Sequence, residues 1–265
     1  MPYQNALQNF KKENVRVFQN HAQKTLKDAI NSKNIAIFRS AVDAAYRDAA
    51  RTFTGIGSHA EEKEKALANF AEAVQSYFTA SADNMDFDEK HNSWCEQLIK
   101  KFKPYEITYG QAQKIVNMTF KYLYCLDDAN TLFNDYFKQC HVALDSFTLA
   151  WIWKCCEADK TFTKFAEWSN LTKTGEPKAK RTKAKAGYLD VVELYRTHSA
   201  ITTKYSGCSP FQAEFIFWPE IQKELAAESF LIQLEDADKK RAKEIKAMSL
   251  KDKWKTILDK IQKIT

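Results

Sequence analysis

Glycine and proline are scarce in this chain, whose 265 residues contain only 6 Gly and 5 Pro. Proteins of many strands need these residues in their tight turns, and this sequence has too few of them for such a fold. Strong helix formers, chiefly Lys, Ala, Glu, Leu and Gln, are plentiful. Hydrophobic residues make up 45% of the chain, which is enough to fill a sizeable core. The sequence therefore predicts one all-α domain over residues 1–265.

The sequence carries no recognisable targeting or membrane signal. No stretch approaches the roughly 18 uninterrupted apolar residues of a membrane span, and the segment Met1 to Asn5 lacks the basic-then-apolar order of a signal peptide. The cysteines form no CxxC pattern and are irregularly spaced, which favours reduced thiols. We expect a cytoplasmic monomer with no membrane partner.

Apolar residues that recur every three or four positions predict the helices. This pattern covers residues 22–30, 35–53, 60–80, 161–169, 188–205 and 211–227, with further helices over 228–265. One more helix carries Trp94 and Leu98 and ends before Pro104. Another begins after Thr108 as its N-cap, and the next begins near Asp145 and ends near Cys156.

Several classes of chemistry find no support in the sequence. His91 and Cys95 share a helical face, but no further metal ligands follow at a recognisable spacing. Neither a Gly-x-Ser-x-Gly elbow nor a Walker loop occurs. We therefore expect no metal and no cofactor, and we exclude serine hydrolases and P-loop NTPases.

Positive charge points to a polyanionic partner. The chain has 40 Lys+Arg against 34 Asp+Glu, for a net charge of +6. The predicted loop 172–187 is strongly basic, and its candidate phosphate contacts are Lys178, Lys180, Arg181 and Lys183. Two interpretations stay open for this loop: a solvated surface insertion, or a segment that follows the phosphate backbone of DNA.

Two segments carry the residues best suited to chemistry. The first is Gly110 to Met118 at the start of a predicted helix, and the second is His141 to Phe147. Asp145 lies 31 residues after Lys114. Lys114 is a potential nucleophile and Asp145 a potential stabiliser of positive charge. The alternatives are an ordinary surface lysine and an aspartate that only caps a helix.

These segments resemble those of the helix-hairpin-helix DNA glycosylases, over residues of about 90–220. The resemblance implies that Gly110 and Gln111 in the hairpin contact DNA phosphate, Gly110 through its backbone amide. It also implies that Lys114 is the nucleophile of a bifunctional enzyme and that Asp145 is the catalytic aspartate.

Within that superfamily the chain is most similar to the archaeal 8-oxoguanine glycosylases. Lys121 matches a second lysine of that branch, and Glu214 with Trp218 matches an acidic residue four positions before a base-stacking tryptophan. Met118 stands where the branch has a stacking phenylalanine. The resemblance implies that these four residues surround the extruded base, although Trp218 also suits a protein core.

The implied activity is excision of a modified base by base flipping and attack at the anomeric carbon, with or without abasic-site lyase activity. The resemblance favours an oxidised purine such as 8-oxoguanine in DNA repair. The change at Met118 suits a bulky modified cytosine instead, such as glucosylated hydroxymethylcytosine in phage DNA, as antiviral defence in a prokaryote. The alternatives are a non-catalytic helical DNA-binding module and a helical protein-interaction scaffold.

The basic loop gives a first test. Neutralising its four cations together should make the slope of log K against log salt shallower by about 0.9 for each phosphate of duplex DNA that the loop no longer neutralises. The slope is measured by fluorescence anisotropy over a salt series, with the unchanged protein as reference. An unchanged slope would mean that this loop does not touch DNA.

Overall fold

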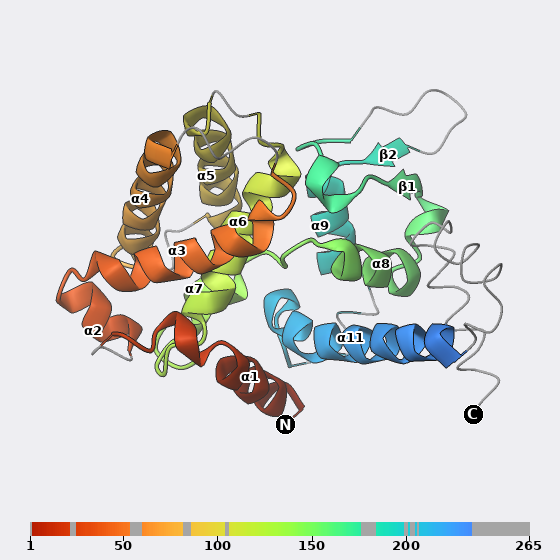
Figure 1. Cartoon of the computed structure of the whole chain (residues 1–265), viewed down its shortest axis with the longest axis horizontal. Helices are drawn as coiled ribbons and strands as arrows, with labels where there is room; N and C mark the ends of the chain where they lie inside the picture. Colours follow the sequence, from red (N-terminus) through yellow and green to blue (C-terminus); the bar gives the residue numbers. More distant parts are fainter. Residues whose placement is uncertain are drawn as a thin grey trace.

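The structure is a computed structural model, and almost all of its regular secondary structure is helical (Figure 1). It describes residues 2–21, 25–53, 60–81, 86–103, 106–175, 184–198, 201, 205 and 207–234. The expectation of a mostly helical protein is confirmed. Among these residues, no helix has the length and apolar character needed to cross a membrane.

Helix α6 (Tyr109–Leu123) is the centre of the fold. Thr108 caps it as expected: its side chain accepts a hydrogen bond from the Gln111 amide, and the Gln111 side chain accepts one from the Thr108 amide at 2.9 Å. All 15 residues of α6 are buried, because other helices pack around it. Its main neighbours are α3 (Ile35–Ala50) and α5 (Phe87–Lys101).

An aromatic core joins α6 to the first half of the chain. The Phe120 ring centroid lies 5.5 Å from that of Tyr77, 5.1 Å from that of Phe87 and 5.5 Å from that of Trp94. These residues come from α4 (Ala60–Tyr77), α5 and α6. The short helix α2 (Leu26–Asn31) precedes α3 on the same side of the molecule (Figure 1). The edge-to-ring contacts of Phe120 with Tyr77 and Phe87, and its stacking on Trp94, hold α4, α5 and α6 together.

The second half of the chain lies on the other side of α6 (Figure 1). It consists mainly of α8 (Ser146–Cys155), α9 (Tyr188–Thr197) and α11 (Pro210–Leu234), and α1 (Pro2–Glu13) packs against α11. Trp151 stacks on Phe217 with ring centroids 4.3 Å apart, which places both rings in the core of this half. Segments from both ends of the chain thus meet beside α6.

Three details of the helix prediction need correction. Residues 161–169 are not helical: they hold strand β1 (Phe162–Phe165) and a 3-10 turn at Trp168–Asn170. Strand β1 pairs in parallel with β2 (Ala184–Ala186), and this long-range pairing outweighs local helix propensity. The helix expected over 188–205 ends at Thr197. The segment between α6 and residue 140 contains the short helix α7 (Asn134–Lys138), which the apolar pattern did not predict.

Some of the sequence predictions concern residues outside the described part of the chain. Lys178, Lys180, Arg181 and Lys183 lie outside the described residues, and so do residues 235–265 of the expected C-terminal helices. The helix predicted to begin at residue 211 extends to Leu234 as α11.

Gly110 does not present its amide to solvent, which corrects the expected phosphate contact. Its N–H donates to the Leu171 carbonyl at 2.9 Å. A Cβ at this position would lie 1.8 Å from the Trp168 carbonyl oxygen, so the glycine allows the 168–171 turn to approach α6. The Gln111 side chain also lies within the protein, where it donates to the Thr52 carbonyl at 3.0 Å.

Gly110→Ala should therefore destabilise the protein. The added methyl group overlaps backbone atoms that cannot move without displacing the turn, and overpacking of this kind costs about 1–3 kcal/mol or more. The free energy of unfolding, measured in denaturant, should fall accordingly. Weaker DNA binding with unchanged stability would contradict this interpretation and restore the phosphate contact.

Candidate functional site

Lys114 and Asp145 form an ion pair. Lys114 Nζ donates to Asp145 Oδ2 at 2.8 Å, and the two side chains are 8% and 14% exposed. Lys114 is on α6 and Asp145 precedes α8, so the fold brings together the two residues that the sequence singled out. Two charges so far removed from water are costly unless they are paired, and this contact pairs them.

The two carboxylate oxygens of Asp145 have separate roles. Oδ1 accepts hydrogen bonds from the backbone N of Thr148 at 2.9 Å and from its hydroxyl at 3.1 Å, which is the geometry of a helix N-cap. Oδ2 accepts from Lys114 and, at 3.3 Å, from the indole Nε1 of Trp218. Capping α8 and pairing with Lys114 therefore occur together.

Asp145 is held as a carboxylate. Burial raises its pKa, but the charge and hydrogen bond of Lys114, the Thr148 amide and the charge of Lys121 together keep the pKa below its ordinary value. A buried anion beside a lysine can stabilise positive charge that develops nearby.

A second ion pair lies deeper in the protein. Lys121 Nζ donates to Glu214 Oε1 at 2.7 Å, and the side chains are only 3% and 1% exposed. Glu214 Oε2 accepts from the Ala143 amide at 3.3 Å. Lys121 and Glu214 thus link α6 to α11 and to the segment that leads to Asp145.

Aromatic rings surround the Lys121 ammonium. Its Nζ lies 4.9 Å from the ring centroid of Phe10, 5.2 Å from that of Phe215 and 5.4 Å from that of Trp218. These distances are within the range of cation–π interactions. The rings replace part of the hydration that this cation loses on burial.

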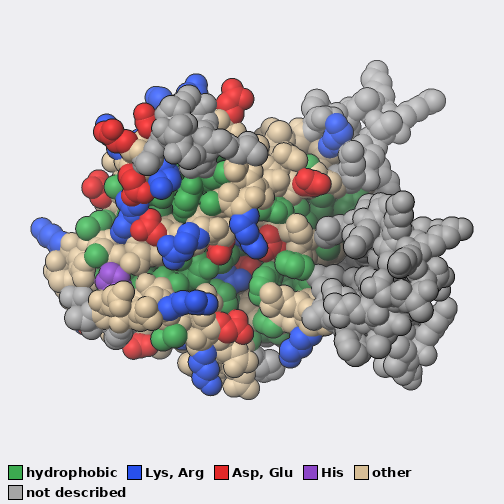
Figure 2. Space-filling view, viewed as in Figure 1, with side chains coloured by type: hydrophobic (Ala, Val, Ile, Leu, Met, Phe, Trp, Pro, Cys, Tyr) green, Lys and Arg blue, Asp and Glu red, His purple; other side chains and the backbone are tan. Residues whose placement is uncertain are grey.

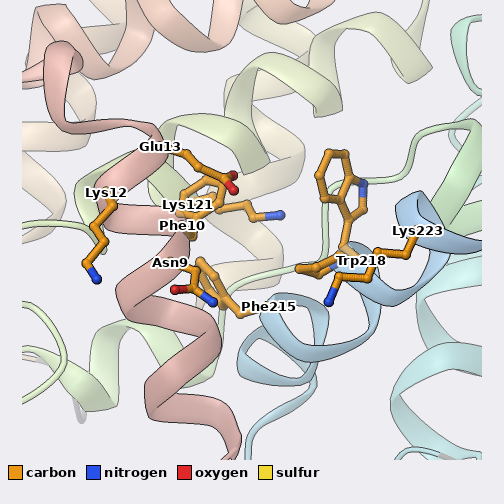
Figure 3. Close-up of a pocket in the computed structure, with 9 residues that line it drawn as sticks. Asn9, Phe10, Lys12, Glu13, Lys121, Phe215, Trp218 and Lys223 are labelled. Atoms are coloured by element: carbon orange, nitrogen blue, oxygen red, sulfur yellow. The ribbon is translucent and has the colours of Figure 1, made fainter. Parts of the chain in front are cut away.

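A cavity of about 280 Å³ opens beside this cluster. In Figure 3, the side chains of Lys121 and Trp218 point toward one another, with α1 on one side and α11 on the other. The lining residues are Asn9, Phe10, Lys12, Glu13, Lys121, Phe215, Trp218, Pro219 and Lys223. Three of these residues are aromatic and four are charged.

Trp218 connects the cavity to the Lys114–Asp145 pair, because its ring lines the cavity while its N–H donates to Asp145.

The sequence analysis missed the contribution of α1 to the cavity, since nothing in the local pattern of residues 2–13 indicates a pocket wall. Glu214 is not among the described lining residues, but it forms an ion pair with Lys121, which does line the cavity. Met118 is 8% exposed and is not among the described residues that line the cavity, so the structure does not bring it to this site.

The segment that carries Asp145 is fixed by side chains from α6. Residues 140–144 are buried without regular secondary structure. Asn117 Nδ2 donates to the Val142 carbonyl at 3.0 Å, and the Gln113 carboxamide pairs with the Leu144 backbone. These contacts satisfy backbone groups that would otherwise be buried without partners.

A buried hydrogen-bond chain continues from Asn117 to the surface. Tyr188 Oη lies 2.9 Å from Asn117 Nδ2, whose two protons are shared among Tyr188 Oη, the Val142 carbonyl and Gln113 Oε1. The same oxygen lies 2.7 Å from His141 Nδ1 and 3.1 Å from His91 Nε2. His141 Nε2 lies 2.6 Å from Asp88 Oδ1. One arrangement of protons satisfies the chain: His91 donates to Tyr188, Tyr188 to His141, and His141 to Asp88.

Both histidines are neutral near pH 7. Burial lowers the pKa of His141 to about 4, although Asp88 opposes this shift, and burial also lowers the pKa of His91. The contact of His141 with Asp88 is therefore a hydrogen bond rather than an ion pair. Cys95 Sγ lies 3.8 Å from the His91 ring, but the described residues contain no group of three or more potential metal ligands.

Comparison of the chain with protein-family models, curated proteins and solved structures finds no match. The geometry of the site is therefore the basis for a functional proposal.

The neutral histidines predict a loss of stability in acid. His141 has a pKa of about 4 in the folded protein, below its ordinary value of 6.5, so the unfolded chain binds its proton first as pH falls. The free energy of unfolding should decrease as pH falls from about 6.5 to about 4, by roughly 3 kcal/mol for this residue.

The measurement is denaturant unfolding over pH 4 to 7.5, with His141→Gln as the matched control. The Gln carboxamide can still donate to Asp88 but does not titrate, so the pH dependence should become less steep by the His141 contribution. An equally steep dependence in this variant would show that His141 is not responsible.

Proposed function

We propose that this chain is a DNA glycosylase with a helix-hairpin-helix type of core over about residues 90–220. One observation carries the proposal: Trp218 lines an aromatic cavity and also donates to the carboxylate that pairs with Lys114. An amine, an anion and an aromatic surface are the three groups needed to hold an extruded base and attack its sugar.

The cavity suits a single base that has left the DNA stack. Its volume of about 280 Å³ is close to the lower end of small-molecule sites. Phe10, Phe215 and Trp218 offer apolar and π faces to a planar ring, and Lys121 offers hydrogen-bond donors to a ring carbonyl. Enzymes that flip bases read the extruded base with such groups.

The Lys114–Asp145 pair supplies the chemistry in this proposal. Asp145 stabilises positive charge as the bond between the sugar C1′ and the base breaks, and the bonding electron pair leaves with the base, which then takes up a proton. Once that bond has broken, Lys114 transfers one proton to Asp145, and its nitrogen lone pair forms the new bond to C1′. The nitrogen then releases a second proton, which the departed base takes up. Asp145 returns its proton to O4′ as the sugar ring opens, which gives a protonated imine and restores the carboxylate. In a monofunctional enzyme, water replaces Lys114 as the nucleophile.

DNA is the proposed partner, and the enzyme acts as a monomer in the cytoplasm of a prokaryote. Figure 2 shows Lys and Arg side chains over the middle of one face, with apolar side chains exposed between them and acidic groups interspersed. The net charge of +6 favours binding to phosphate. Because Gly110 and Gln111 have internal partners, lysine and arginine side chains make the phosphate contacts in this proposal.

Two substrate classes follow from the resemblance: oxidised purines such as 8-oxoguanine, which belong to DNA repair, and bulky modified cytosines such as glucosylated hydroxymethylcytosine, which belong to antiviral defence. The purified protein is incubated with synthetic duplexes of each class and with phage DNA, and released bases are identified by mass spectrometry. Release of one class assigns the substrate. DNA binding without any released base would favour a non-catalytic DNA-binding module.

The sharpest test concerns Lys114. Borohydride should trap the imine as a covalent adduct, and the modified peptide should contain Lys114. Lys114→Gln should abolish the adduct and leave DNA affinity nearly unchanged, because it removes one of 40 positive charges. Lys100→Gln removes an exposed lysine of α5 and serves as the control for charge.

Asp145→Asn should lower the single-turnover excision rate by orders of magnitude, since each 1.36 kcal/mol of lost transition-state stabilisation is about tenfold in rate. Base release that depends on Asp145 but gives no adduct would indicate a monofunctional enzyme. Full excision by both variants would refute the assignment of this site.

A further inference from the structure

Leu144 immediately precedes Asp145, and its backbone is held by a side chain instead of a neighbouring strand. Gln113 Nε2 donates to the Leu144 carbonyl at 2.8 Å, and the Leu144 amide donates to Gln113 Oε1 at 3.3 Å. The carboxamide thus pairs with both polar groups of one residue, as an adjacent strand would. This contact fixes Leu144 in position and in rotation.

The orientation of the Gln113 carboxamide is itself determined. Its second Nε2 proton goes to the Gly110 carbonyl at 2.9 Å, and its Oε1 also accepts from Asn117 Nδ2 at 2.9 Å. Both donors and the acceptor are therefore engaged. Gln113 is 0% exposed, so water does not compete for these bonds. Rotating the amide would break four hydrogen bonds at once.

Asp145 is consequently held from both sides along the backbone. On one side Gln113 fixes Leu144, and on the other the Asp145 carbonyl accepts from the Leu149 amide at 2.9 Å as α8 begins. Lys114, the residue after Gln113, contacts the Asp145 side chain. Two adjacent residues of α6 therefore act on the same segment. Gln113 holds the backbone before Asp145, and Lys114 holds the Asp145 carboxylate.

We propose that Gln113 is a positioning residue for Asp145: its carboxamide sets the Leu144 peptide so that Asp145 Oδ2 meets both Lys114 and the Trp218 indole. The role in catalysis rests on the proposed glycosylase activity, whereas the placement of the carboxylate does not. Gln113 touches neither Lys114 Nζ nor the cavity; it acts through Leu144.

The Trp218 indole reports on this placement without any need for activity. Its Nε1–H donates to Asp145 Oδ2, and a hydrogen bond to a carboxylate moves an indole proton downfield. The resonance is recorded in a ¹H–¹⁵N spectrum at pH 7 and assigned by its loss in Trp218→Phe. A residue that only stabilises the core would not alter it.

Gln113→Met keeps the length of the side chain and removes its hydrogen bonds. The Trp218 indole proton should move upfield, and the excision rate should fall on the order of 100-fold with DNA affinity unchanged, because small displacements of catalytic groups have effects of that size. Leu123→Ala, a buried substitution at the other end of α6, is the control: it should lower the melting temperature and leave the indole resonance in place.

Gln113→Glu tests the same contact within one folded protein. When the introduced carboxyl is protonated it can accept from the Leu144 amide and donate to the Leu144 carbonyl, so the indole signal should match that of the unchanged protein at the same pH. When it ionises, it faces the carbonyls of Leu144 and Gly110, and the signal should move upfield. This variant decides the question if Gln113→Met does not fold.

An unmoved indole resonance in Gln113→Met, or in Gln113→Glu at both ends of its titration, would overturn the proposal. If the indole moves as expected but the unchanged protein releases no base from any DNA, Gln113 still positions Asp145 and the glycosylase proposal alone fails.

Discussion

Two lysines on a helix that is buried on every side dominate this structure. Lys114 and Lys121 both belong to α6, and each requires a partner because an unpaired buried charge is far more costly than a paired one. The partners come from different parts of the chain: Asp145 from the start of α8 and Glu214 from α11. The second half of the fold is therefore attached to the first through two charge contacts as well as through aromatic packing.

The two pairs differ in depth, and this difference separates their roles in the proposal. Lys121 and Glu214 are 3% and 1% exposed, enclosed by rings, and suited to shaping the cavity floor. Lys114 and Asp145 are 8% and 14% exposed, so a substrate can reach them more readily. Trp218 lies between the two pairs, with its ring toward Lys121 and its N–H toward Asp145. A planar ligand seated against Trp218 would therefore lie next to both.

The expectation that the residues of the two ion pairs and Trp218 lie near one another came from the resemblance to a known family. Local sequence patterns supplied the helix starts, because capping and periodicity act over short stretches, as at Thr108 and Asp145. These patterns failed to predict contacts between distant segments. The 162–165 strand depends on a partner about twenty residues later, and the α1 wall of the cavity depends on packing against α11. Gly110 was misjudged for the same reason: only the 168–171 turn reveals why a side chain is excluded there.

The hydrogen-bond chain from His91 through Tyr188 and His141 to Asp88 has a consequence for how such a protein can change over evolutionary time. Each buried side chain of this set is hydrogen-bonded to the next. Replacing one side chain with an apolar one therefore leaves a buried polar group without its hydrogen-bond partner. Replacing all of them together with apolar groups of similar shape would be far less harmful. Homologous sequences should accordingly keep this set intact or lose it as a block, and intermediate combinations should be rare.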